Sequence, residues 1–333
     1  MVRVGIRQIA AEADVSVATV SRVLNHQGNV DARVRERVLS VADRLGYRPN
    51  GVARSLRLRS TRALGAVIPT ILNPYFTAAV RAMQDAAAAR GYVLLVGNVD
   101  RDPANEEVEL TALMDRQIDG LLLVSALLEP SPTLLRTIEQ GVPVVAMERV
   151  VQGLAVDHVI PDARGGMRLA IAHLAERGRQ RIAFLANPPR IWTGETKRAG
   201  YRDGLEAAGL PYDPTLVIPG GNDPDDGERA AEAMLALSPR PDAVIIGNQQ
   251  MGLGALRAIQ RRGVRVPDDL AIVGSDAAWA DIVTPALTVI VQQSGAVGRR
   301  AVELLLERLD RPQLERPPVL EIVPTSLLVR DST

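Results

Sequence analysis

The stretch DVSVATVSRVLN, residues 14–25, decides how the first part of this chain folds. Asp14 and Val15 are predicted to form a turn that leads into Ser16. The Ser16 hydroxyl is placed to accept a hydrogen bond from a free backbone N–H group at the start of a helix, so a helix is predicted over residues 17–25. The apolar residues of that helix recur at helical spacing and are expected to face inward. They are Val20, Val23 and Leu24.

Two further helical segments flank this one. Residues 6–13 have an apolar stripe, and a third helix is predicted from Asp31, which can cap it, to Leu45. The Arg48-Pro49 pair then forces an extended link, and residues 51–58 are too few to form a stable helix alone. Three short helices with a tight turn between the first two are the pattern of a helix-turn-helix domain.

The formal net charge of zero conceals two oppositely charged parts. Residues 1–62 hold twelve arginines and five acidic residues, whereas residues 63–333 have an equal surplus of acidic residues. A basic head joined to an acidic body indicates that only the head meets a polyanion. A solvated helical face is the alternative explanation of the basic surplus.

The composition excludes several classes of protein. The 333 residues are 47% hydrophobic and 23% charged, as in an ordinary globular chain of about two domains. With no cysteine and three scattered histidines, we expect no disulfide scaffold, no thiolate chemistry and no histidine-based metal site. We find neither an apolar stretch of signal-peptide length near the start nor a run long enough to span a membrane. We therefore expect a cytoplasmic protein.

After Ser60 short apolar runs alternate with amphipathic helical stretches. Repeated β-α units predict parallel sheets with helices on both faces and right-handed crossovers. About ten units are too many for one comfortable sheet, so two lobes are expected. The predicted strands lie at 63–68, 92–97, 120–125, 143–147, 181–186, 243–247 and 270–274. The predicted helices lie at 75–90, 105–116, 166–177, 196–208, 225–237 and 251–262.

Residues 14–25 closely resemble the helix-turn-helix signature of the LacI/GalR (lactose/galactose repressor) family of transcriptional regulators. Residues 45–50, LGYRPN, and 52–56, VARSL, are similar to that family's third-helix end and hinge helix. The resemblance extends through essentially the whole chain. Further matching segments are NPYF at 73–76, DGL at 119–121, GVPVV at 141–145, LGAL at 253–256, VPDD at 266–269 and TPALT at 284–288.

The resemblance implies a small all-α helix-turn-helix head and an α/β two-lobed body. The body is like the type I periplasmic binding proteins, with doubly wound parallel sheets and a ligand cleft between the lobes. The expected parts are a DNA-binding domain at 1–48, a hinge helix and linker at 49–61, and an effector-binding and dimerisation domain at 62–333. Within that body the N-lobe is expected to hold about 62–161 plus 292–320, and the C-lobe about 162–291 plus 321–330.

The second helix offers side chains that suit a DNA major groove. Val17 and Ala18 can approach base edges and thymine methyl groups, and Arg22 can reach guanine one turn later. Short polar residues beside them suit phosphate oxygens. Core packing for Val17 and a solvated charge for Arg22 are the alternatives. Together with the family motifs, this predicts the DNA-binding residues Ser16, Val17, Ala18, Thr19, Ser21, Arg22, Asn25, Tyr47, Asn50, Ala53, Arg54 and Leu56.

By the same resemblance, residues 50–58 match a hinge helix that folds on DNA and wedges a leucine between base pairs in the minor groove. Leu56 occupies the matching position; without the resemblance we would expect it to pack against Val52. A helix this short needs a partner, so we expect a homodimer on double-stranded palindromic operator DNA. A change in the separation of the two hinges would then change DNA affinity.

Loops at the C-terminal ends of parallel strands line the ligand cleft in such a body. Asp276 matches the family's ligand-binding acid, and amides such as Asn248 bind vicinal hydroxyls well. Both tryptophans are expected in loops, where a flat ring can stack on a ligand or pack between the lobes. The predicted effector-binding residues are Asn73, Phe76, Asp100, Ser125, Arg149, Trp192, Lys197, Asn248, Gln249, Asp276 and Trp279.

Lys197 is the single lysine among 39 basic residues. Because many members of the family have a ligand-contacting arginine there, we interpret Lys197 as a compact charge that suits the effector, with an unselected substitution as the alternative. The sequence departs from the family at three other places. Gln249 replaces an aspartate, residues 161–163 are altered, and Gly5 replaces a threonine cap. The first two departures are atypical of a standard hexose site.

We therefore expect a DNA-binding transcriptional repressor whose operator affinity is controlled by a small-molecule effector, a sugar or sugar derivative, bound between the lobes. It would be associated with the nucleoid and need no cofactor. A nucleoside- or purine-responsive regulator of the same family is the alternative. A solute-binding protein, the second class, would need a signal sequence and no basic head. An enzyme is not expected, because the best candidate motif, Gly252-Leu253-Gly254, lies within a helical pattern.

Overall fold

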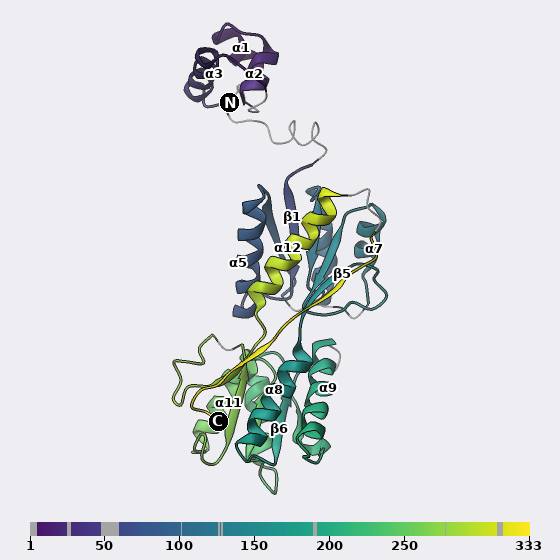
Figure 1. Ribbon diagram of the computed structural model, residues 1–333, viewed down its shortest axis with the longest axis vertical. Coiled ribbons are helices and arrows are strands. Elements are labelled where there is room, and N and C mark those ends of the chain that lie inside the picture. The colour runs from purple at the N-terminus through teal and green to yellow at the C-terminus, as the bar shows by residue number, and fades with distance from the viewer. Residues whose placement is uncertain are drawn as a thin grey trace. The chain divides into compact units, whose positions relative to one another are not determined.

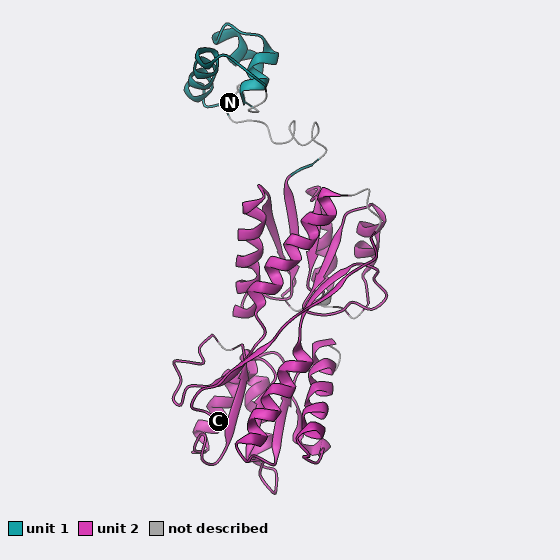
Figure 2. Cartoon of the chain, viewed as in Figure 1, with its two compact units in different colours: residues 1–61 teal, residues 62–333 magenta. Residues whose placement is uncertain are grey.

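The computed structural model describes residues 5–24, 28–47, 60–100, 102–125, 127, 129–188, 192–276, 278–311 and 316–333. The chain divides into two compact units, residues 1–61 and residues 62–333, which Figure 2 shows in different colours. We call them the head and the body. No helix within the described residues is long and apolar enough to cross a membrane.

The head is a three-helix unit, as predicted. Asp14 adopts a left-handed backbone conformation with φ of 48°, which makes the tight turn before the second helix. Ser16 Oγ accepts from Thr19 N at 3.1 Å and caps that helix, whereas Gly5 gives the first helix no side-chain cap. Asp31 caps the third helix by accepting from two backbone N–H groups. The helices are α1 (Ile6–Glu12), α2 (Val17–Leu24) and α3 (Ala32–Arg44), around a core of Ile9, Ala10, Ala13, Val20, Val23, Val38, Val41 and Ala42.

The first lobe of the body is a six-stranded sheet in the order β11-β5-β4-β3-β1-β2. All neighbouring strands are parallel. Helices α5 and α12 bury one face of this sheet, as Figure 1 shows, and α6 and α7 bury the other. The strands are β1 (Ala63–Ile68), β2 (Val93–Asn98), β3 (Gly120–Leu123), β4 (Val144–Met147), β5 (Asp157–Pro161) and β11 (Leu320–Val323). The helices are α5 (Pro74–Ala89), α6 (Pro103–Asp115), α7 (Pro132–Glu139) and α12 (Ser294–Asp310).

The second lobe repeats this architecture with the order β12-β10-β9-β8-β6-β7. Only β12, at one edge, runs antiparallel to its neighbour among these described strands. Helices α8 and α9 pack on one face, and α10 and α11 pack on the other. The strands are β6 (Ile182–Ala186), β7 (Val217–Pro219), β8 (Ala243–Ile246), β9 (Ala271–Ser275), β10 (Thr288–Val291) and β12 (Ser326–Leu328). The helices are α8 (Ala163–Glu176), α9 (Trp192–Ala207), α10 (Pro224–Leu235), α11 (Gln249–Arg261) and a 3-10 turn, Pro214–Leu216.

The chain passes between the lobes three times: between β5 and α8, between β10 and α12, and between β11 and β12. The third passage corrects the predicted change of lobe at 320/321. Residues 320–323 pair in parallel register with residues 158–161 of the first lobe, so the chain leaves that lobe only after Val323. The last residues return to the second lobe, where the Ser332 hydroxyl accepts from Thr288 N at 2.9 Å.

The Gly252-Leu253-Gly254 segment lies inside α11 and serves packing. A Cβ on Gly254 would stand 1.6 Å from the carbonyl oxygen of Pro224 at the start of α10. A Cβ on Gly252 would stand 3.0 Å from a ring carbon of Trp279. The two glycines therefore allow α10 and the Trp279 ring to approach α11 closely, and the segment is no dinucleotide-binding turn.

Candidate functional site

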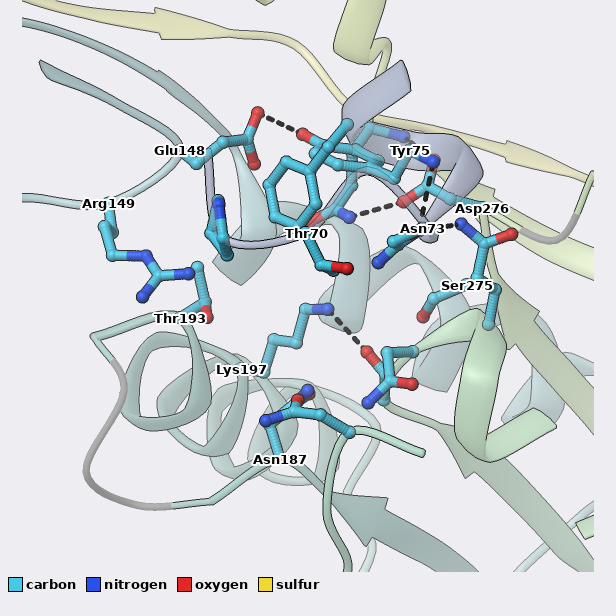
Figure 3. Close-up of a pocket in the computed structure, with 17 residues that line it drawn as sticks. Thr70, Asn73, Tyr75, Glu148, Arg149, Asn187, Thr193, Lys197, Ser275 and Asp276 are labelled. Atoms are coloured by element: carbon cyan, nitrogen blue, oxygen red, sulfur yellow. Dashed lines mark hydrogen bonds between the residues drawn. The ribbon is translucent and has the colours of Figure 1, made fainter. Parts of the chain in front are cut away.

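A cavity of about 180 Å³ is lined by residues from both lobes of the body (Figure 3). Most of its residues follow the C-terminal ends of parallel strands or begin the next helix, which is where ligands bind in doubly wound sheets. The first lobe contributes Pro69, Thr70, Asn73, Tyr75, Phe76, Glu148 and Arg149. The second lobe and its connections contribute Asn187, Thr193, Lys197, Asn222, Gly247, Asn248, Gln249, Ser275, Asp276 and Gln292.

Two of these residues are helix caps, which fixes their side chains at the cavity. Asn73 caps α5 by accepting from Tyr75 N at 3.0 Å. Asn248 caps α11 by accepting from Met251 N at 2.9 Å, and its amide nitrogen donates to Gly221 O at 2.9 Å. The N-termini of α5 and α11, one from each lobe, therefore open onto the same cavity.

Four side chains of the lining carry a formal charge at neutral pH, and these formal charges balance. They are Glu148, Arg149, Lys197 and Asp276. Among the described residues, none of the four takes part in an ion pair within 4.0 Å. Asp276 has a left-handed backbone with φ of 43°, and its carboxylate accepts from Gln292 N at 2.8 Å and from the Gln292 side-chain amide.

Glu148 and Lys197 each have a neutral partner. The Tyr75 hydroxyl donates to Glu148 Oε1, so that carboxyl is held within the first lobe. Lys197 Nζ donates to Gly247 O at 2.7 Å, and only 6% of Lys197 is exposed. Burial of a charge without an adjacent opposite charge is costly, so burial shifts the pKa of each group toward its neutral form.

The pKa values reflect this burial. Burial raises the pKa of Glu148 to about 7; the hydrogen bond from Tyr75 opposes the shift, and the nearby charge of Asp276 adds to it. Burial also raises the pKa of Asp276. It lowers the pKa values of Lys197 and Arg149 in the same cavity. The pKa values of all four groups should therefore change when a ligand fills the space between them.

Two buried polar atoms beside the cavity have no hydrogen-bond partner among the described residues: Arg149 Nε and Asn187 Oδ1. Figure 3 shows both side chains at the edge of the open space, one from each lobe. Arg149 Nε needs an acceptor and Asn187 Oδ1 needs a donor. A hydroxyl group supplies both functions, which makes polyhydroxylated molecules a natural match for these two atoms.

Seven of the eleven predicted effector-binding residues line the cavity. They are Asn73, Phe76, Arg149, Lys197, Asn248, Gln249 and Asp276. Asp100 and Ser125 do not line it. Asp100 is exposed in the turn after β2, and Ser125 is buried with its hydroxyl donating to the carboxylate of Glu106 at 3.0 Å.

Neither tryptophan lines the cavity. Trp192 begins α9 and does not lie in a loop, and Trp279 packs against the hydrophobic cluster under α11. The aromatic residues at the cavity are Tyr75 and Phe76, whose rings meet edge to face with centroids 5.4 Å apart. The sequence favoured the tryptophans because both were expected in loops. A position in a loop does not determine where a side chain points.

Sequence reasoning missed several lining residues. Asn187 follows β6 directly and Ser275 ends β9, so the rule that selected Asn73 would have found them. Tyr75 was missed because its role depends on the direction of its hydroxyl. Gln292 follows β10, a strand that was not predicted. The other lining residues outside the predicted set are Pro69, Thr70, Thr193, Asn222, Gly247 and Glu148, and Glu148 stands directly before the predicted Arg149 at the end of β4.

On the head, the start of α2 presents an exposed surface. Val17 is 43% exposed although it is apolar, so it does not belong to the head core. Tyr47 packs against that core. Ser16, Ala18 and Arg22 are exposed, and Thr19 and Ser21 are half-buried. The predicted residues Asn25, Asn50, Ala53, Arg54 and Leu56 lie outside the described residues.

Comparison with known proteins agrees with both units. Residues 5–50 match the family described as bacterial regulatory proteins, lacI family, and residues 171–333 match a periplasmic binding protein-like domain. A ribose operon repressor of Halalkalibacterium halodurans is 32% identical over 330 residues, which cover 98% of this chain and 96% of the repressor. The chain belongs to the LacI family.

Other LacI-family proteins align over similar lengths. The repressor PurR of Mannheimia succiniciproducens is 32% identical and covers 98% of each chain. A transcriptional regulator CelR in complex with cellobiose is 33% identical, with a TM-score of 0.75 over 99% of this chain and 100% of that one. The lac repressor dimer bound to operator and the anti-inducer ONPF has a TM-score of 0.86 at 27% identity, over 99% of both chains.

These findings confirm the predicted family and fold. The LacI-family chain is a DNA-binding transcriptional regulator and not an enzyme. Its head is the family's helix-turn-helix domain, and its body has the two-lobed, effector-binding architecture.

Proposed function

We propose that this LacI-family repressor binds a neutral polyhydroxylated molecule, a monosaccharide or a close derivative, in the cavity between its lobes. Binding would change its affinity for a palindromic operator. The observation that favours this ligand is the pair of buried, unsatisfied atoms Arg149 Nε and Asn187 Oδ1. Adjacent hydroxyls can accept from the guanidinium and donate to the amide oxygen, which removes both desolvation penalties.

The charge balance of the cavity supports a neutral ligand. When Glu148 is ionised, the formal charges of Glu148 and Asp276 offset those of Arg149 and Lys197. An anionic ligand would face two buried carboxyl groups, and a cationic ligand would face two buried bases. A neutral ligand with several hydroxyls can bond to all four groups without adding an unpaired charge.

The size of the cavity supports a single ring. An engineered cavity of about 150 Å³ binds one benzene ring, and the volume of this cavity is about 180 Å³. That space suits one sugar ring and is small for two. The edge of the cavity also offers Phe76, which can cover an apolar face of such a ring.

A purine is the competing ligand within the family, because relatives named PurR align with the whole chain. A flat base favours an aromatic surface on which to stack. Phe76 offers one such surface, but most of the lining is polar: six amide side chains, those of Asn73, Asn187, Asn222, Asn248, Gln249 and Gln292, lie beside the four charged groups. This lining favours the polyhydroxylated ligand.

For the head, we propose that α2 enters the major groove. Val17 and Ala18 would contact base edges, Arg22 would read guanine, and the capping Ser16 with its polar neighbours would lie near phosphates. Two heads of a homodimer would bind the two halves of the operator, with the predicted hinge segment 49–61 between head and body. The protein would act in the cytoplasm, at the nucleoid.

Calorimetric titration of the full chain tests the ligand. Neutral pentoses and hexoses, hexuronic acids and purine bases are compared, and each ligand that binds is added to an operator-binding assay. We expect a neutral monosaccharide to bind and to change operator affinity, and Arg149→Met to weaken its binding about tenfold. The control is Arg299→Met, which alters an exposed arginine of α12. Binding of a purine or an acidic sugar in place of every neutral sugar would overturn the proposal.

A further inference from the structure

The N-termini of α5 and α11 meet across the cleft through one pair of amide side chains. Gln249 is the first residue of α11, and only 3% of it is exposed. Its side-chain amide donates to Oδ1 of Asn73, the residue that caps α5. We call this pair the Asn73–Gln249 bridge. It joins a residue of the second lobe to a residue of the first.

Gln249 ties α11 to the first turn of α5 in either orientation of its amide, but the partner differs: the hydrogen bond to Asn73 Oδ1 exists in the first orientation, and in the exchanged one the Gln249 oxygen faces that acceptor. With its oxygen and nitrogen exchanged, the amide would accept from Tyr75 N at 3.1 Å and donate to Asp276 O at 3.1 Å. Tyr75 N belongs to the same first turn of α5, so both orientations tie α11 to α5. The exchanged orientation adds a bond to Asp276, another residue of the cavity.

Among the described residues, two side-chain hydrogen bonds join the lobes outside the three connecting segments. One is the bridge, and the other runs from Gln250 Nε2 to Leu72 O, at 3.5 Å and on the exposed surface. A bond of that length contributes little. The bridge is therefore the principal polar contact between the lobes on this side of the cavity.

We propose that Gln249 is a positioning residue, which through Asn73 holds the two halves of the effector cavity together before any effector binds. An unliganded protein with the bridge would spend most of its time closed. A site that is already closed binds with nearly its full intrinsic affinity, whereas one that is mostly open loses affinity in proportion to its closed fraction. This role concerns the unliganded chain and goes beyond the proposed function.

Spin-label distances in the full chain test the bridge without effector or DNA. Because the sequence has no cysteine, labels attach only at introduced sites, here Glu139→Cys on α7 and Glu206→Cys on α9, both exposed. Labelled chain is diluted with unlabelled chain so that each dimer has one labelled subunit. We expect one short distance, and a second, longer distance in Gln249→Ala, with the open-to-closed ratio raised roughly twofold to tenfold.

Gln260→Ala is the matched control, because Gln260 is an exposed residue near the other end of the same helix. It should leave the distance distribution unchanged. If the unliganded protein is already open, or if Gln249→Ala has the distribution of the parent, the proposal is overturned. Neither result bears on the effector's identity, since no effector is present.

Variants of Asn73 test the bridge from the other lobe. Asn73→Ser can still cap α5 but is too short to reach Gln249, whereas Asn73→Asp keeps both the cap and the acceptor. We expect the longer spin-label distance to appear in Asn73→Ser and the single short distance to remain in Asn73→Asp. Adding Gln249→Ala to Asn73→Ser should cause no further opening, because both changes remove one contact. Additive opening would show that the two residues act separately and would overturn the proposal.

Discussion

The backbone N–H of Gln292 donates to Asp276 Oδ1 at 2.8 Å, so a carboxylate of the cavity is bonded to a segment that connects the lobes. The Gln292 side-chain amide donates to the other carboxylate oxygen. Gln292 directly follows β10 of the second lobe, and α12 of the first lobe begins at Ser294. A ligand that draws the carboxylate away from Gln292 therefore acts on the connection itself.

The first prediction concerns this carboxylate. Asp276→Asn should weaken effector binding roughly tenfold to a hundredfold, because it removes a charged acceptor and turns one amide N–H toward the Gln292 amide. Operator affinity without effector should stay the same. Calorimetry and an operator-binding assay measure the two quantities. Asp281→Asn, at an exposed position, is the control; equal effector affinity in Asp276→Asn and this control would contradict the assigned role.

The second prediction concerns pH. Burial raises the pKa of Glu148 from 4.5 to about 7, so the folded chain holds a proton that the unfolded chain has released. Between pH 4.5 and 7 the free energy of unfolding should therefore fall as pH rises, with a contribution from Glu148 on the order of 3 kcal/mol. Glu148→Gln should remove that contribution, and the exposed Glu206→Gln should not. Denaturant unfolding at several pH values measures the effect in both variants. If the free energy of unfolding changes with pH equally in Glu148→Gln and the parent, Glu148 does not bind a proton on folding.

The third prediction concerns the single lysine. Lys197 Nζ donates to Gly247 O at 2.7 Å from a buried position. The longer, planar guanidinium of Lys197→Arg cannot occupy that space as a compact charge, so effector response should fall about tenfold while operator affinity stays unchanged. Dose–response curves for operator release measure the effect. Arg202→Lys, on the exposed face of the same helix, is the control, and an unchanged response in Lys197→Arg would show that the effector does not need a lysine.

The fourth prediction concerns helix packing. Gly254→Ala would place a methyl group 1.6 Å from Pro224 O, so α10 and α11 must separate. We expect a loss of about 1–3 kcal/mol in the free energy of unfolding. Gly295→Ala, in α12, meets only Ala82 Cβ at 3.8 Å and should be neutral or stabilise the chain by about 0.5–1 kcal/mol. If denaturant unfolding gives the two variants the same free energy of unfolding, the close approach of Gly254 to Pro224 does not contribute to stability.

The fifth prediction concerns DNA. A homodimer that makes about 6–10 phosphate contacts should lose about 10³–10⁵ in operator affinity between ~50 and ~200 mM salt. Val17→Ala should weaken binding to the operator more than binding to random DNA, since an apolar contact to a thymine methyl group reads sequence. Leu56→Ala should do the same through the predicted wedge. Fluorescence anisotropy measures all three; a flat salt response, or full binding after deletion of residues 1–60, would refute DNA binding through the head.

Much of the fold follows from the sequence because buried parallel strands are continuous apolar runs. The run 63–68 is β1 without error, and the predicted helices agree with the observed ones to within a few residues. The predicted set lacks the interior strands β5 and β10 and the edge strands β7, β11 and β12. Edge strands have the weaker pattern. In β11 the residues alternate between exposed and half-buried, and β12 has only three residues, so neither gives an apolar run. The change of lobe expected from the resemblance at about 320/321 falls at the start of β11, whereas the strand continues in the first lobe to Val323.

Apart from Lys197 in α9, which the family resemblance indicated, the predicted residues of the candidate site are those that follow predicted strand ends. The rule that ligands meet the C-terminal ends of strands placed Asn73, Asn248 and Asp276 at the cavity. It also selected Ser125, whose hydroxyl turns inward to Glu106. The direction of a side chain depends on contacts between residues far apart in the chain, such as Tyr75 with Glu148, and no local pattern contains that information.

The three passages of the chain between the lobes have a consequence for synthesis on the ribosome. The first lobe lacks α12 and β11 until residues 294–323 have been translated, and by then β6 to β10 of the second lobe already exist. The head needs only neighbouring residues and can form as soon as its three helices have emerged. The nascent protein must therefore fold its head early and hold an unfinished first lobe, with the sheet face under α12 uncovered, until translation is nearly complete.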